Sequence, residues 1–153
     1  MGNDMLHINV GQFAAEHDCY EGRDEELDTN ILDEDKLLDL LEIVFQQAAA
    51  SGKGIVADFH VCEIFPERWF DLVLVLRSTT EILFDRLSAR GYSDRKRSEN
   101  LEAEIMQVIL DEAKASYASE IVQELPSNTV QDLQSNVQRT CSWCDQWVAD
   151  HVK

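Results

Sequence analysis

The chain has 153 residues, of which 44% are hydrophobic and 8% aromatic, a composition typical of one globular domain and not of a disordered chain. Thirty Asp and Glu against thirteen Lys and Arg give a formal net charge of −17, so direct binding to nucleic acid is not expected, because it needs clustered basic side chains. No apolar run approaches the roughly 20 residues that cross a membrane, and the N-terminus lacks a signal-peptide layout, so we expect a soluble intracellular protein with no membrane partner.

The acidic surplus has two interpretations. A basic protein partner would be attracted to such a chain. Alternatively, the charge only maintains solubility, which is the interpretation that composition alone favours.

The four cysteines, Cys19, Cys62, Cys141 and Cys144, do not follow the spacing of a secreted disulfide framework, so a reducing compartment is expected. Cys141 and Cys144 could form half a zinc site or a redox pair. A structural zinc needs four ligands, and the sequence offers neither a second pair nor two closely spaced histidines. Both cysteines fall on the apolar stripe of the last predicted helix, and we interpret them as buried thiols.

In chain order, residues 6–10 predict a short strand and residues 11–19 one or two helical turns. Residues 21–28 are too charged to pack and predict a mobile surface segment. Asp33 can then cap a helix with a 3.6-residue apolar period, which the Ser-Gly-Lys-Gly sequence at residues 51–54 ends. The apolar positions of this helix are Leu37, Leu38, Leu41, Val44, Phe45 and Ala48.

Residues 55–60 predict a second strand, and residues 72–76 a third one buried on both faces, because its apolar run does not alternate. Ser78 and Glu81 have the capping-box spacing and open a helix that Gly91 ends.

Residues 101–125 predict one long amphipathic helix, which Pro126 breaks. A last helix carries a stripe of small and branched apolar side chains at Val130, Leu133, Val137, Cys141, Cys144 and Val148. The order of strands and helices predicts an α/β layer fold with a parallel sheet.

The Ser-Gly-Lys-Gly sequence could be mistaken for a phosphate-binding loop. A Walker loop has the pattern GxxxxGK[ST] after a strand and before a helix, so that backbone N–H groups face the phosphates. Here a helix precedes and a strand follows, so Gly52 and Gly54 are interpreted as a helix stop and turn.

Asp58 and His60, in the segment Ala-Asp-Phe-His, are the strongest local signal of chemistry. An acid at the carboxyl end of a parallel strand points to the crevice where α/β proteins bind ligands, and in phosphate-transfer enzymes it holds Mg²⁺, usually through water. His60, two residues further on, is expected on the same face, where it could position a water or an acceptor. The alternative is that the strand-end Asp only caps a loop.

Five bases fall within twelve residues of this acidic chain: Arg86, Arg90, Arg95, Lys96 and Arg97. They could form a mobile lid whose arginines close over phosphates. The alternative is a solvated basic loop. Such clustering in an acidic chain favours the lid slightly.

Taken together, these segments resemble the adenylate kinase isoenzyme 6 family, the coilin-interacting nuclear ATPases. The resemblance covers about residues 6–151, and its most specific part is DFHxCxxFPERWF at residues 58–70. The other matching segments are INVG at 8–11, ILDED at 31–35, VLR ending at 77, RLxxRGY at 86–92, EIMQV at 104–108, ASY at 115–117 and ELPSN at 124–128.

The resemblance implies a P-loop kinase core, a three-layer αβα fold with a parallel sheet in strand order 2-3-1-4-5, in a single domain over residues 1–153. It implies ATP:AMP phosphotransfer, ATP hydrolysis, and a role in maturation of the small ribosomal subunit and its rRNA. The implied ligands are ATP, AMP and Mg²⁺, the implied protein partner is a basic small-subunit ribosomal protein, and the implied location is the nucleus and cytoplasm.

By position, the resemblance makes Asp58 the acid that holds Mg²⁺ through water when phosphate is present, and His60 its catalytic companion. Arg90 becomes the arginine that meets ATP, in a lid of residues 89–99, and Arg86 is a second candidate for contacting ATP. The monophosphate-binding segment corresponds to residues 9–32, with Asn9 and Gly11 at its start.

This sequence also departs from the family pattern. The family's first strand and GTPGxGKTT loop are absent from the 153 residues, and Ala15 replaces the arginine expected to contact the acceptor phosphate. The helix after ILDED is about five residues longer. We expect a sheet without its central first strand, impaired catalysis, doubtful nucleotide binding, and self-association through exposed strand edges.

Three interpretations follow for such a chain. It is an enzyme of the family represented by an incomplete gene model or isoform, a noncatalytic acidic assembly factor for a basic ribosomal protein, or a nonfunctional product. We favour the first.

Overall fold

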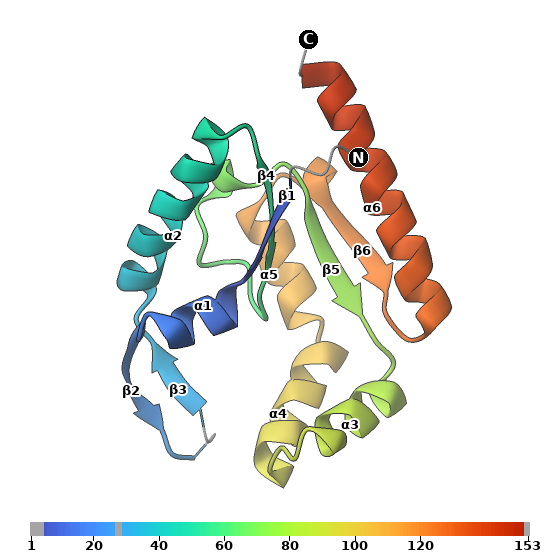
Figure 1. Ribbon diagram of the computed structural model, residues 1–153. Coiled ribbons are helices and arrows are strands. Elements are labelled where there is room, and N and C mark those ends of the chain that lie inside the picture. The colour runs from blue at the N-terminus through green and yellow to red at the C-terminus, as the bar shows by residue number, and fades with distance from the viewer. Residues whose placement is uncertain (1–4, 27–28, 152–153) are drawn as a thin grey trace. The chain divides into compact units, whose positions relative to one another are not determined.

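The computed structural model describes residues 5–26 and 29–151 (Figure 1). The chain divides into two compact units, which we call the N-terminal unit (Asn3–Pro66) and the C-terminal unit (Glu67–Lys153). Parallel strands alternate with helices in each unit, so the α/β class expected from the sequence is confirmed. No helix within residues 5–26 and 29–151 is long and apolar enough to cross a membrane.

The N-terminal unit contains a parallel strand pair, a β-hairpin and two helices. Its elements are β1 (Met5–Asn9), α1 (Val10–Glu16), β2 (Tyr20–Asp24), β3 (Thr29–Leu32), α2 (Glu34–Ala50) and β4 (Gly54–Asp58). β1 and β4 run parallel, with Leu6 opposite Ile55 and Asn9 opposite Asp58. The register brings the carboxyl ends of both strands to one edge, which is where an α/β protein presents polar side chains to a ligand.

Helix α2 packs against β4, and α1 contacts both strands of the pair (Figure 1). The Asp33 side chain accepts a hydrogen bond from the Lys36 N–H at 3.2 Å, as the cap prediction required. Leu37 and Leu41 are fully buried, and burying a leucine side chain contributes about 1.5–3 kcal/mol. The helix ends where Gly52 takes a φ of +70°, a conformation that costs glycine little.

The hairpin β2–β3 corrects the prediction of a mobile segment over residues 21–28, of which 27–28 lie outside the described residues. Antiparallel pairing joins Gly22 to Ile31 and Asp24 to Thr29, so the backbone groups are satisfied although the side chains are mostly exposed. A charged strand is stable here because its partner lies only a few residues away, which limits the entropy lost on closing the hairpin.

The described part of the C-terminal unit holds a second parallel pair, four α-helices and two short 3₁₀ helices, labelled η1 and η2. Its elements are η1 (Glu67–Trp69), β5 (Val73–Arg77), α3 (Thr80–Ala89), α4 (Asp94–Ile105), α5 (Val108–Ser116), η2 (Ser119–Ile121), β6 (Val122–Pro126) and α6 (Val130–His151). β5 and β6 pair from Val73 opposite Val122 to Arg77 opposite Pro126. β5 is buried at Val73 and Val75 but exposed at Leu76, so the prediction of a strand buried on both faces is wrong.

The predicted single helix over residues 101–125 is also wrong. Gln107 takes a left-handed φ of 57° and separates α4 from α5, and the chain is extended again at Tyr117. Val122 and Leu125 are buried in β6 beside β5. Residues 122–126 form a strand because they pair with β5, which lies more than forty residues earlier in the chain. The spacing of apolar residues within the segment does not reveal this partner.

The start of α3 lies one residue later than the capping-box prediction. Thr79 is the cap, and its hydroxyl accepts from the Ile82 N–H at 3.4 Å. Ser78 instead donates to the Ser127 carbonyl at 3.0 Å. Gly91 ends the helix with a φ of +75°, as expected.

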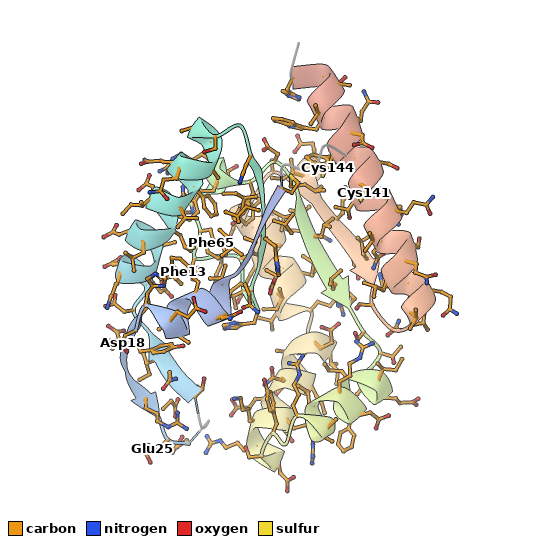
Figure 2. All side chains as sticks on the ribbon, in the orientation of Figure 1. Phe13, Asp18, Glu25, Phe65, Cys141 and Cys144 are labelled. Carbon is orange, nitrogen blue, oxygen red and sulfur yellow. The ribbon has the colours of Figure 1, made fainter. Side chains whose placement is uncertain are left out.

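Helix α6 does not bury its apolar stripe. Val130 and Leu133 are 65% and 60% exposed, and Asn136 is the buried position, donating to the Pro126 carbonyl at 2.7 Å. Cys141 and Cys144, on neighbouring turns of α6 (Figure 2), are half-buried, so the interpretation as buried core thiols is wrong. Burial still raises the pKa of the Cys144 thiol.

Within the described residues, β4 has β1 as its hydrogen-bonded neighbour and β5 has β6. In the strand order 2-3-1-4-5, the strands numbered 2 and 3 are neighbours, and so are the strands numbered 4 and 5. The two observed pairs agree with these two pairings. No described strand takes the place of the first strand of that order.

Candidate nucleotide site

Asp58 is the last residue of β4, and its carboxylate contacts the imidazole Nε2 of His7 on β1. Asn9 lies opposite Asp58, so His7 is two residues back on the neighbouring strand and projects to the same face. The side chains of His7 and Asp58 are 65% and 57% exposed, so water screens the pair and it contributes little to stability. Sequence analysis missed His7, because its closeness to Asp58 depends on the strand register.

A pocket of about 200 Å³ opens beside this strand end, entirely within the N-terminal unit. It brings together Gly11 from α1 and His60 after β4, two residues that the sequence analysis had singled out. The full lining is Gly11, Ala14, Tyr20, Thr29, Asn30, Leu32, Phe59 and His60. The pocket therefore joins α1 and the β-hairpin to the Asp-x-His segment.

Two aromatic side chains of the pocket lining, Phe59 and His60, contact each other. Their rings meet edge to face with 4.1 Å between centroids. The Phe59 ring centroid also lies 6.0 Å from that of Phe65, which is buried. β4 ends at Asp58, so the strand alternation that predicted Asp58 and His60 on one face does not extend to His60. His60 lines the pocket, whereas Asp58 lies outside its lining and faces His7.

Asn9, the other residue predicted at the start of this segment, has a structural task. It is the N-cap of α1, and its side-chain oxygen accepts from the Gln12 N–H at 3.0 Å. The segment predicted at residues 9–32 contributes six of the lining residues. Among them, Tyr20, Thr29 and Asn30 were not singled out from the sequence. These residues line the pocket because they belong to the β2–β3 hairpin. The high charge of residues 21–28 had predicted a mobile segment instead of this hairpin.

Besides the imidazole of His60, the lining offers hydroxyl and amide groups from Tyr20, Thr29 and Asn30. Such a lining suits the uncharged part of a nucleotide, its base and sugar, through stacking and hydrogen bonds. No Lys or Arg lines it in the described part of the chain, and Ala15, beside Ala14, is exposed.

The two arginines predicted to contact ATP lie in the C-terminal unit and differ in their surroundings. The Arg86 guanidinium donates to the Ser127 carbonyl at 2.7 Å, to the Asn128 carbonyl at 3.3 Å and to the Ser78 hydroxyl at 3.1 Å. Arg86 thus ties α3 to the loop after β6. Arg90, the C-cap of α3, is exposed, and its guanidinium forms no hydrogen bond or ion pair with any described residue.

The remaining bases of the predicted lid make surface contacts. Arg97 donates to the Asp94 carboxylate at 2.8 Å and lies over the Phe84 ring at 4.4 Å. Lys96 lies over the Tyr92 ring at 4.3 Å. The predicted lid of residues 89–99 is therefore the end of α3, a turn, and the first half of α4.

An ionic cluster that sequence analysis missed anchors the other end of α4. The Arg77 guanidinium contacts the Glu104 carboxylate, donates to the Glu104 carbonyl at 3.0 Å and reaches the Glu124 carboxylate at 3.1 Å. The hydrogen bond to Glu104 raises the pKa of Arg77 above its ordinary value. The cluster joins α4 to the end of β5 and to the middle of β6.

Asp58 also offers one carboxylate to a cation. Within the described residues, no three His, Cys, Asp or Glu side chains converge as a metal site. A single strand-end carboxylate fits Mg²⁺ that keeps most of its water and is held mainly by a nucleotide's phosphates.

Comparison with known proteins decides the family. A family model described as an AAA domain matches residues 1–107. The adenylate kinase isoenzyme 6 homolog of Saccharomyces cerevisiae is 48% identical over 148 residues, covering 97% of this chain and 73% of the relative. The chain belongs to the adenylate kinase isoenzyme 6 family.

Other relatives of the same name agree. The Candida albicans homolog is 51% identical over 145 residues, which is 95% of this chain and 56% of that protein. The Dictyostelium discoideum homolog is 48% identical over 145 residues, which is 95% of this chain and 80% of that protein. The adenylate kinase isoenzyme 6 assignment made from the sequence is therefore confirmed, and with it an α/β fold of the P-loop NTPase kind.

Proposed function

We propose that the protein acts in the adenylate kinase reaction, ATP + AMP to 2 ADP, with ATP hydrolysis as a side activity. In this proposal the N-terminal pocket receives AMP. The observation that carries it is the meeting of Gly11 and the hairpin with Phe59 and His60 in one pocket. The predicted monophosphate segment and the Asp-x-His motif are far apart in the sequence, and a shared ligand site explains why they converge.

In the proposed arrangement each residue has a distinct task. In the pocket, Phe59 and His60 contact the acceptor nucleotide, and His60 is the residue proposed to position it. Asp58 holds Mg²⁺ through water. Arg90 contacts the ATP phosphates, since its guanidinium is exposed and pairs with none of the described residues. Arg86 instead donates hydrogen bonds to residues 127–128 and so stabilises the fold.

We also propose that the 153-residue chain by itself does not transfer phosphate at a measurable rate. It contains no GxxxxGK[ST] sequence and so supplies neither a backbone cradle nor a lysine for the β- and γ-phosphates. Removing one preorganised donor typically costs about 10²–10³ in rate, so lacking the set abolishes catalysis. ADP formation from ATP and AMP at rates typical of kinases, about 1–100 s⁻¹, would overturn this part of the proposal.

The acceptor site is testable without catalysis. AMP is titrated into the chain by calorimetry and by NMR, with adenosine as the comparison ligand. Because no Lys or Arg of the described residues lines the pocket, we expect AMP and adenosine to bind with similar, weak affinity. We expect His60 resonances to shift with both ligands. Adenosine leaving His60 unperturbed would overturn the assignment of the pocket.

Ala15→Arg is the sharper variant, because it introduces a cation at an exposed position next to the pocket. A charge-assisted hydrogen bond contributes about 1.5–3 kcal/mol, so AMP affinity should rise roughly tenfold to a hundredfold while adenosine affinity stays unchanged. Ala15→Gln is the matched control, since it adds length without charge. Equal gains for AMP and adenosine would contradict the proposed site.

A second candidate function is a noncatalytic assembly factor for a basic small-subunit ribosomal protein, in the nucleus and cytoplasm. The net charge of −17 favours it, because opposite net charges speed association. The test is anisotropy of a labelled basic ribosomal protein titrated with the chain at several salt concentrations. Binding that weakens steeply with salt supports this function, and no binding at low salt excludes it.

A further inference from the structure

Ser98, on the exposed side of α4, directly follows three consecutive bases, Arg95, Lys96 and Arg97. Protein kinases that select basic substrates recognise such bases through carboxylates in their peptide groove, with an arginine three residues before the serine as the main contact. Arg95 holds that position relative to Ser98. We propose that Ser98 is a phosphorylation site for a protein kinase of this basic-directed class.

The surroundings of Ser98 allow a kinase to reach it. The residue is exposed, and its hydroxyl forms no hydrogen bond with the described residues. α4 has no buried residue in its whole length, so opening its first turns loses little apolar burial. A kinase that binds its substrate in extended form can therefore engage residues 95–98 at low cost.

The ion pair of Arg95 with Glu99 is a surface contact that such an opening breaks at little cost. Arg95 donates to Glu99 at 3.4 Å, with both side chains about half exposed, and surface pairs of this kind contribute little to stability. Lys96 lies over the Tyr92 ring. Arg97 donates to Asp94 within α4, and it also contacts α3, donating to the Ser88 hydroxyl at 3.3 Å and lying over the Phe84 ring. Opening the first turns of α4 therefore also breaks the contacts of Arg97 with α3.

Ser93, which caps α4 five residues before Ser98, is a comparison site. Ser93 also has an arginine three residues before it, Arg90, but Gly91 and Tyr92 stand in the intervening positions. The Ser93 hydroxyl accepts from the Lys96 N–H at 3.2 Å as the cap of α4. Ser93 thus has one base where Ser98 has three, and its hydroxyl is engaged, so the kinase should prefer Ser98.

The reaction is an ordinary phosphoryl transfer. The Ser98 hydroxyl oxygen attacks the γ-phosphorus of ATP bound to the kinase, and the bond from that phosphorus to the β–γ bridging oxygen breaks. ADP leaves, and the hydroxyl proton passes to the kinase's carboxylate base.

The phosphate would change the charge of the lid. Residues 89–99 contain four bases, Arg90, Arg95, Lys96 and Arg97, and two acids, Asp94 and Glu99, a net charge of +2. A phosphoserine adds about −1.5 to −2 and brings the segment close to neutral. It lies three residues from Arg95, so it competes with Glu99 for that guanidinium.

A regulatory consequence follows, and it rests on the proposed function of Arg90 as an ATP contact. Lowering the positive potential around Arg90 weakens attraction of the ATP phosphates. We expect phosphorylation to lower ATP affinity by about three- to tenfold at low salt, and by less at high salt because exposed charges are screened.

The modification is tested on the full 153-residue chain with ATP and the catalytic subunit of the cyclic-AMP-dependent protein kinase. Tandem mass spectrometry locates the phosphate in the wild type and in Ser98→Ala, Ser93→Ala and Arg95→Gln. We expect Ser98 to carry most of the phosphate, Ser93→Ala to react like wild type, and Arg95→Gln to react about tenfold or more slowly, since it loses a charge-assisted contact. Circular dichroism confirms that each variant is folded.

No incorporation, or incorporation mainly at a residue other than Ser98, overturns the proposal. A second measurement separates it from the proposed function. A fluorescent ATP analogue is titrated into phosphorylated wild-type chain and into unphosphorylated wild-type chain. Unchanged affinity refutes the regulatory consequence alone, whereas no binding by either form refutes ATP binding by this chain and leaves Ser98 as a modification site.

Discussion

Replacing Arg77 by Met should destabilise the C-terminal unit far more than removing any base of the lid. Arg77 and Glu104 have side chains only 20% and 18% exposed. Methionine keeps much of the length and apolar stem of arginine but removes its donors to Glu104 and Glu124. The substitution leaves the Glu104 carboxylate largely buried without its cation.

The size of the destabilisation follows from the unpaired Glu104 carboxylate. Removing one partner of a fully buried ion pair costs about 3–5 kcal/mol. The Arg77 side chain keeps some exposure and that of Glu124 is half exposed. We therefore expect Arg77→Met to lower the free energy of unfolding by about 2–3 kcal/mol. Arg95→Met is the matched control. Its pair with Glu99 is 57% and 47% exposed, and its loss should cost less than about 0.5 kcal/mol.

Tryptophan fluorescence during urea unfolding measures this directly, because Trp69, Trp143 and Trp147 all lie in the C-terminal unit. The midpoint for Arg77→Met should fall with little change in slope, while Arg95→Met follows wild type. Arg77→Met, Glu104→Gln should recover part of the loss, because a neutral amide is cheaper to bury than an unpaired carboxylate. An Arg77→Met chain within 0.5 kcal/mol of wild type would refute the view that this cluster holds α4 in place.

Three further predictions test other parts of the structure. Leu41→Ala removes a fully buried side chain of α2 and should cost about 2–5 kcal/mol by far-UV circular dichroism, whereas Ile43→Ala, at a half-exposed position, should cost less than 1 kcal/mol. Burial raises the pKa of the Cys19 thiol. The stability that the neutral thiol contributes is therefore complete below the unfolded pKa of about 8.5 and is lost as pH rises through the higher pKa of the folded protein. Cys19 should also react with iodoacetamide more slowly than Cys62, and equal rates would show that Cys19 is accessible. Gly91→Ala places a Cβ at a φ of +75° and should cost about 1 kcal/mol, and a neutral result by thermal melting would show that the turn after α3 relaxes.

Features that depend on neighbouring residues were predictable from the sequence. Asp33 caps α2, and Gly52 and Gly91 end helices through positive φ angles, because caps and glycine conformations are decided within a single turn. Asp58 was predicted at the end of a strand and is the last residue of β4. Gly11 and His60, both singled out from the sequence, line one pocket, and their binding of a ligand stays a prediction.

Features that depend on distant partners were not predictable from spacing. β6 was mistaken for part of a helix, because Val122 and Leu125 fit a helical period until β5 is known to lie beside them. The apolar stripe of α6 was assigned to the core, but Val130 and Leu133 are exposed. Periodicity shows which side chains share a face and does not show whether that face is covered.

The sequence by itself determined the family, through residues 58–70 and the other matching segments. It also determined the chemical types of the candidate residues, which are an acid, a histidine and a cluster of bases. Tertiary structure alone decided their partners. The register of β1 against β4 sets His7 beside Asp58, the hairpin closes the pocket around His60, and three separate segments bring Arg77 to Glu104 and Glu124. Each of these contacts joins residues more than twenty positions apart, where only folding determines distance.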